Sequence, residues 1–230
     1  TLDAQTDGTG YNTAVGNNAL TLNTSGAYNT AVGANALDAN TTANDNTAVG
    51  YAALGANNEG HSNVAVGNYA GDAITTGDWN VAIGKYALSS VQTTNSSTAV
   101  GTEALSSSTG EQNTAFGYQA LYANSTANAN VAVGFEASLT NQTGTGNTAV
   151  GYTALKYNTN HGNTAVGFKA LYTNTSAGNC TAVGYNTLAL NQTGANNCAM
   201  GSQAMAASVS ASYNTVIGND ALKAQQTGSE

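Results

Sequence analysis

The chain has 230 residues, of which only 7% are charged, and its formal net charge is −8. Four Lys and Arg residues are too few for a dense phosphate-binding surface, which argues against a nucleic-acid partner. The sequence contains no run of about 18 apolar residues, so this segment is not expected to insert into a membrane.

The chain begins in the middle of a repeat, because Thr1–Ala4 aligns with Ala36–Ala39. From Asn12 onward a motif close to N-T-A-V-G-x-x-A-L-x-x-N-T-T-G-x-x occurs thirteen times, at intervals of 17 residues with two intervals of 16. A fixed period of this length is the signature of a repeat architecture. We expect one continuous array over residues 1–230, with both ends inside a repeat, as in a segment of a longer fibre. The closing glycines of the motif are Gly16, Gly33, Gly50, Gly67, Gly84, Gly101, Gly117, Gly134, Gly151, Gly167, Gly184, Gly201 and Gly218.

Each motif predicts a short strand that ends at its glycine. The Thr and Val positions are two residues apart, share one face of a strand and are mostly β-branched. We expect the Val position to be buried. A second short strand is predicted at the Ala-Leu pair, such as Ala19-Leu20, and the Asn-Thr-Thr-Gly residues predict a turn. Stacking these units predicts an all-β fold, a parallel β-solenoid (β-roll) of about thirteen coils of 17 residues.

The alanine of the motif points away from the valine, so we expect it to face outward. We call the residues that hold one position in successive repeats a column. A column held at one methyl group in twelve of thirteen repeats suggests close contact with a flat surface, and a homo-oligomer is the simplest source of one. The predicted interface column is Ala14, Ala31, Ala48, Ala65, Ala82, Ala99, Ala115, Ala132, Ala149, Ala165, Ala182 and Ala199.

The units resemble the head repeats of trimeric autotransporter adhesins, and also repeats in phage and viral tail fibres. Asn80-Val81-Ala82-Ile83-Gly84 is the nearest local match to the adhesin pattern S-V-A-I-G. The resemblance covers essentially the whole chain. It implies a left-handed β-roll, three chains side by side, and display outside a cell or on a virion surface.

Two further columns are candidate binding or modification sites. The residue after the glycine is aromatic in six repeats, which predicts either a stabilising ladder or a platform for a sugar or receptor. A column of Asn-x-Ser/Thr sequences predicts either glycosylation sites or a ladder of bonded amides in the turn. The aromatic residues are Tyr51, Tyr118, Phe135, Tyr152, Phe168 and Tyr185. The asparagines are Asn23, Asn40, Asn124, Asn141, Asn174 and Asn191.

Catalytic signals are weak. Asp38 and Asp72 share a column but lie two repeats apart, and His61 and His161 are lone turn residues. We therefore expect no catalytic residue, no metal site and no cofactor. The cysteines, Cys180 and Cys198, occupy different columns, so we expect free thiols rather than a disulfide.

The sequence thus predicts a structural and adhesive segment of an extracellular or virion surface fibre. Its partners would be further copies of itself in a homotrimer, together with a glycan, a matrix protein or a host receptor bound by repeated weak contacts. The alternative is a self-assembling filament subunit. An ice-binding solenoid is a minor alternative, because regular rows of Thr hydroxyls can match ice, but the Thr column shares a face with Val, which we read as interior.

Overall fold

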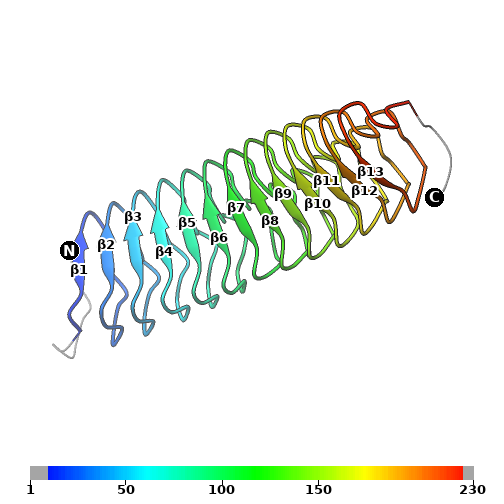
Figure 1. Cartoon of the computed structure of the whole chain (residues 1–230). Coiled ribbons are helices and arrows are strands. Elements are labelled where there is room, and N and C mark those ends of the chain that lie inside the picture. The colour runs from blue at the N-terminus through cyan, green and yellow to red at the C-terminus, as the bar shows by residue number, and fades with distance from the viewer. Residues whose placement is uncertain (1–9, 225–230) are drawn as a thin grey trace. The chain divides into compact units, whose positions relative to one another are not determined.

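The computed structural model describes residues 10–224 and shows the predicted all-β, parallel β-solenoid fold, with no helix among these residues (Figure 1). The chain divides into two compact units. Unit 1 ends at Asn113 and unit 2 begins at Thr114. The alignment of Thr1–Ala4 with the repeat, and the end of the chain at Glu230, lie outside the described residues.

Each repeat contributes one strand of three residues. Unit 1 contains β1 (Thr13–Val15), β2 (Thr30–Val32), β3 (Thr47–Val49), β4 (Val64–Val66), β5 (Val81–Ile83) and β6 (Thr98–Val100). Unit 2 contains β7 (Thr114–Phe116), β8 (Val131–Val133), β9 (Thr148–Val150), β10 (Thr164–Val166), β11 (Thr181–Val183), β12 (Cys198–Met200) and β13 (Thr215–Ile217).

Within each unit, every strand pairs in parallel with the next one and in the register of the repeat. Ala31 of β2 pairs with Ala48 of β3, and Ala149 of β9 pairs with Ala165 of β10. The motif glycine ends the strand because its backbone conformation is closed to other residues: Gly50 has φ +139°. A Cβ at Gly50 would lie 2.3 Å from the carbonyl oxygen of Gly67 in the next coil, so only glycine allows the coils to approach this closely.

The predicted second strand at the Ala-Leu pair is wrong. This segment is a series of turns in which Asn35 and Leu37 have left-handed backbone conformations, with φ +57° and +49°. The chain therefore curls instead of extending, and both Ala36 and Leu37 are fully buried. The backbone still bonds to the next coil, since the N–H of Leu37 donates to the carbonyl of Ala53 at 3.1 Å.

The predicted orientation of the first strand is also wrong. The Ala side chains point into the coil and the Val side chains point out: Ala48 is fully buried, whereas Val49 is 36% exposed. The reason is the narrowness of the coil. A Cβ placed on Gly71, on the facing wall, would lie only 3.8 Å from the Cβ of Ala82, so the strand has room for little more than a methyl group.

Buried asparagines at the first position of the motif tie neighbouring coils together. In unit 1, the N–H of Asn46 donates to Oδ1 of Asn29 at 3.0 Å, and Nδ2 of Asn46 donates to the carbonyl of Gly60 at 2.8 Å. These bonds satisfy polar groups that would be costly to bury unpaired. The first residue of the motif is therefore an interior structural residue, a role that the sequence analysis did not assign.

Candidate functional site

The predicted interface column of alanines lies inside the solenoid. Eleven of its twelve members are buried, and Ala14 in β1 is half-buried. A side chain enclosed by its own coil cannot contact another copy of the chain. The column is held at one methyl group because of the close approach of the two walls, not because of an external partner. The buried residues are Ala31, Ala48, Ala65, Ala82, Ala99, Ala115, Ala132, Ala149, Ala165, Ala182 and Ala199.

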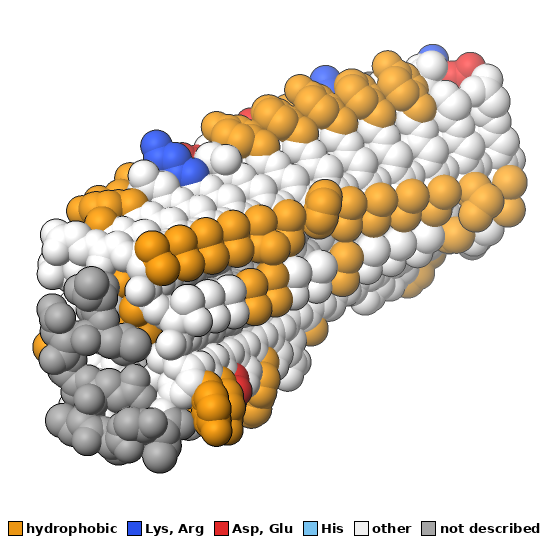
Figure 2. All heavy atoms as spheres, turned by 90° about the vertical axis from the view of Figure 1, so that its left-hand side faces the viewer, with side chains coloured by type: hydrophobic (Ala, Val, Ile, Leu, Met, Phe, Trp, Pro, Cys, Tyr) orange, Lys and Arg blue, Asp and Glu red, His pale blue; other side chains and the backbone are white. Residues whose placement is uncertain are grey.

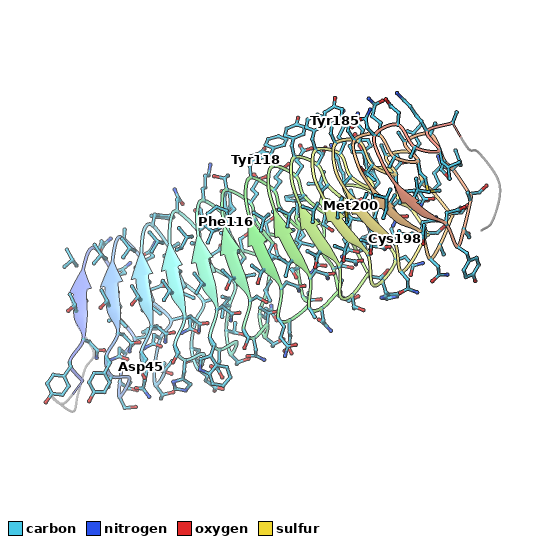
Figure 3. The ribbon with its side chains drawn as sticks, in the orientation of Figure 1. Asp45, Phe116, Tyr118, Tyr185, Cys198 and Met200 are labelled. Carbon is cyan, nitrogen blue, oxygen red and sulfur yellow. The ribbon has the colours of Figure 1, made fainter. Side chains whose placement is uncertain are left out.

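The outward residues of the strands form a regular surface within each unit. We call this surface the Thr–Val face, and it consists of the first and third residues of each strand. The column formed by the third residue of each strand is apolar throughout, with Val66 37% exposed, Phe116 56% exposed and Met200 47% exposed. Phe116 and Met200 project from the strands of unit 2 (Figure 3). Hydrophobic side chains on the surface gather in rows and are not scattered (Figure 2).

Five of the six predicted aromatic residues stack in unit 2. We call them the aromatic ladder: Tyr118, Phe135, Tyr152, Phe168 and Tyr185. Their ring centroids are 5.1–5.3 Å apart and successive rings are inclined by 7–17°. Tyr118 and Tyr185 lie at the edge toward which the strands point (Figure 3). Since each ring covers the face of the next, the ladder offers mainly ring edges to a ligand, a geometry that favours a stabilising role over a sugar platform.

Tyr51 is in unit 1 and does not belong to this ladder. Its ring packs edge-on against Tyr69, 5.2 Å away, and Tyr69 stacks on Tyr86 at 5.3 Å. A hydrogen bond with Tyr51 raises the pKa of Tyr69. Tyr69 and Tyr86 were not predicted from the sequence because they occupy the column one residue further along, beside that of Tyr51. Tyr11 and Tyr28, which stack at 5.5 Å, were not predicted either.

The asparagines of the six sequons form bonded ladders in the interior. Each of them is fully buried. Each donates from Nδ2 to the carbonyl three residues later, as Asn141 does to Gly144 at 2.7 Å, and Asn40 also donates to Oδ1 of Asn23 at 2.9 Å. The structure therefore favours the amide-ladder interpretation. In the folded chain these nitrogens are enclosed and are not accessible for glycosylation.

The two thiols are free. Cys180 replaces the buried motif asparagine and donates from Sγ to the carbonyl of Gly194 at 3.2 Å. Burial raises the pKa of this thiol, which keeps it protonated and unreactive. Cys198 lies on the Thr–Val face, in the Thr column.

The ionisable groups are dispersed. Burial raises the pKa of Asp38 and of Asp72. The imidazole of His61 accepts a hydrogen bond from the N–H of Asn44, and that of His161 accepts one from Thr145, so both histidines tie turns together. Among residues 10–224, no three His, Cys, Asp or Glu side chains are grouped to hold a metal ion, and no helix is long and apolar enough to cross a membrane.

A hollow in unit 2 was not predicted. It has a volume of about 370 Å³. It lies between two columns, one formed by the residues two positions after each motif glycine and the other by the residues five positions after it. In the second of these columns Ala189 and Ala206 are flanked by the larger Tyr172 and Lys223. The signal was therefore present as two small residues in a row of large ones, but recognising it requires knowing that the two columns are neighbours in space.

Comparisons of the chain with protein-family models, with curated protein sequences and with solved structures find no match.

Proposed function

We propose that this chain is a non-enzymatic structural segment of an extracellular or virion surface fibre, in which copies pack side by side through the Thr–Val face and display repeated weak binding surfaces. The single observation that supports this proposal best is the outward apolar column of that face. It contains Val, Ile, Phe and Met and no polar residue at any of its thirteen positions.

An exposed apolar column of this kind needs a cover. Large exposed apolar surfaces on soluble proteins usually mark interaction sites. A second copy fits this surface well, because a face that repeats in register within each unit is complementary to an identical flat face, and cyclic symmetry closes the contact without leaving an edge. The face carries no charged residue in any of the thirteen strands, so no like charges would oppose each other across the interface.

Repetition supports an adhesive role. Identical outward positions recur with each coil, at a spacing of about 4.8 Å. A ligand with its own repeat can engage several such positions, and each additional contact strengthens binding without requiring a strong single site. Copies that pack side by side would multiply these contacts again.

Light scattering at several concentrations tests the proposal. We expect a stable mass near three times 22.9 kDa. Val150→Lys places a charge on the Thr–Val face and should produce monomers, since an unpaired charge in an apolar interface is strongly unfavourable. Gln142→Lys, at an exposed turn, is the matched control and should leave the mass unchanged.

A monomeric wild-type protein would contradict the proposed assembly. A mass that rises without limit as the concentration increases would favour the alternative, a filament subunit whose copies add end to end.

The structure also favours a second candidate, an ice-binding solenoid. The Thr column shares a face with Val, and that face is exterior rather than interior. Thr148, Thr164 and Thr181 follow one another on adjacent strands, so their side chains repeat at about 4.8 Å on the outer surface.

The two candidates compete for one surface and can be separated. An ice-binding solenoid would leave this face uncovered and would show thermal hysteresis, which Thr164→Tyr should abolish by disrupting the flat face. A fibre segment would be oligomeric, with this face covered, and would show no hysteresis. Thermal hysteresis in a monomeric wild type would replace the fibre proposal with the ice-binding one.

A further inference from the structure

We propose that the hollow in unit 2 binds a sugar that carries a carboxylate. We call it the Lys169 hollow; it is lined by Lys169, Tyr172, Asn186, Ala189, Gln203, Lys223 and their neighbours. The inference rests on the proposed function for its adhesive context and specifies the chemistry of one ligand. The hollow itself is formed within a single chain, so it can be tested independently of self-association.

The hollow arises from two small residues. Ala189 and Ala206 occupy a column in which the preceding member is Tyr172 and the following one is Lys223. Since successive coils are about 4.8 Å apart, two alanines in a row leave a gap of about three coil spacings, or roughly 14 Å, between the two large side chains. The resulting volume of about 370 Å³ falls in the range of small-ligand sites.

Positive charge is concentrated around this gap. The whole chain has only four Lys and Arg residues, and Lys169 and Lys223 both line the hollow. Lys223 pairs with Asp220 at 2.9 Å, in an exposed position where such a pair contributes little. The ammonium of Lys169 lies 5.4 Å from the ring centre of Phe168 and 5.3 Å from that of Tyr172. Within residues 10–224 the ammonium of Lys169 has no carboxylate partner, so it is available to pair with a carboxylate of a ligand.

The other walls suit a sugar better than a simple anion. Ala189, Leu190 and Ala206 give an apolar floor, and the ring of Tyr172 stands at one end. This matches the C–H face of a pyranose. Asn186 and Gln203 supply amides along one side, and such amides can donate to and accept from sugar hydroxyls.

The carboxylate is the distinguishing feature of the ligand. A phosphate-rich ligand would require more cations than this surface provides. A neutral sugar would leave Lys169 unpaired. A single carboxylate on a pyranose ring matches one available ammonium, one apolar floor and one row of amides.

The test titrates the intact chain with methyl β-glucuronide, methyl β-glucoside and sodium acetate, followed by chemical-shift changes in two-dimensional NMR spectra. The first two probes differ only in the carboxylate, and acetate supplies the carboxylate alone. We expect saturable binding of the glucuronide, with shifts near Asn186 and Gln203, and affinity at least about tenfold lower for the other two. Added salt should weaken glucuronide binding, since Lys169 is partly exposed.

Variants locate the site. Lys169→Met should lower glucuronide affinity about tenfold by removing the charge. Ala206→Phe should abolish binding by filling the hollow from its half-buried wall. Lys85→Met is the matched control, since the ammonium of Lys85 lies 5.1 Å from the ring centre of Tyr86 in unit 1, in a similar cation–π geometry without the hollow. This variant should bind the glucuronide as the wild type does. Melting curves verify that each variant folds.

Three results would overturn the inference: no saturable binding of the glucuronide, equal affinity for the glucuronide and either of the other probes, or an equal loss of affinity in Lys85→Met. The titration is repeated on the Val150→Lys variant. Binding by a monomeric wild type would refute the proposed assembly and retain the site, whereas a trimer that does not bind would refute the site and retain the assembly.

Discussion

The position after each motif glycine holds different kinds of residue in the two units. Unit 1 has Asn17, Ala34, Tyr51, Asn68, Lys85 and Thr102, with a single aromatic residue, whereas unit 2 begins with the five rings of the aromatic ladder. The interior does not differ in this way. Ala82 and Leu88 in unit 1 are buried as Ala165 and Leu171 are in unit 2. Packing thus fixes the inward columns, while the outward columns are free to differ, and any binding specificity must lie in them.

The largest effect is expected from the glycine that both units share. Gly50→Ala and Gly151→Ala would place a Cβ 2.3 Å and 2.4 Å from a carbonyl oxygen of the next coil, at φ values of +139° and +136°. We expect each to lower the free energy of unfolding by about 3 kcal/mol or more, measured by chemical denaturation.

The control is Gly146→Ala. Gly146 has φ +65°, and a Cβ there would meet nothing within 4 Å, so the cost should be only about 1 kcal/mol. Tolerance of the change in one unit alone would show that the two units do not share this backbone constraint.

The next effect tests which side of the strand faces inward. Ala99→Val in unit 1 and Ala149→Val in unit 2 should each destabilise the fold by about 1–3 kcal/mol, because the narrow coil has no room for two more methyl groups. Val100→Ala and Val150→Ala, on the outer, half-buried side of the strand, should cost less than about 1 kcal/mol when measured at low protein concentration, where self-association does not contribute. The reverse order would restore the orientation predicted from the sequence.

A smaller effect is expected from the column that distinguishes the units. Tyr152 stacks on Phe135 and on Phe168, both at 5.2 Å. Tyr152→Ala removes both contacts and should cost about 2 kcal/mol. Asn68→Ala, the exposed equivalent in unit 1, should change the stability by less than about 0.5 kcal/mol. Equal losses of stability for the two variants in thermal melts would mean that stacking of the rings does not stabilise the fold.

The smallest effects depend on pH. Burial raises the pKa of Asp72 above its ordinary value of 3.8, so the folded state holds this proton more tightly than the unfolded state does. The resulting stabilisation is present below pH 3.8 and is lost as the pH rises through the raised pKa. Asp72→Asn should therefore melt higher than the wild type at pH 7, and this advantage should shrink on acidification. A constant difference between pH 3 and 7 would contradict this account.

Unit 2 should respond at the opposite end of the pH scale. Glu136 accepts a hydrogen bond from Lys156 at 2.6 Å and raises the pKa of that lysine above its ordinary value of 10.5. The stabilisation is present below pH 10.5 and is lost as the pH rises through the raised pKa. The wild type should melt higher than Lys156→Gln at neutral pH, with the difference disappearing in alkali. A difference that persists there would assign the effect to packing of the side chain.

The sequence by itself determined the repeat, the parallel stacking and the corner at each motif glycine. All three follow from periodicity: residues that recur at a fixed interval must occupy equivalent positions, as Ala31 and Ala48 do. The same reasoning brought Tyr118 and Phe135 together, because neighbours in a column are neighbours in space. The buried asparagines of the turns also follow from it, although two interpretations of them had to remain open.

Only the tertiary structure decided which face of each strand is inside. Alternation along three residues identifies two faces but does not distinguish them, and hydrophobicity favoured Val over Ala. The left-handed turns at residues such as Leu37 curl the chain into a narrow coil, which favours a methyl group in the inward column and places a larger side chain there only at Val216. The Lys169 hollow depended on the tertiary structure for the same reason, because the curl of the chain brings Lys169 and Ala189, from two separate columns, to one surface.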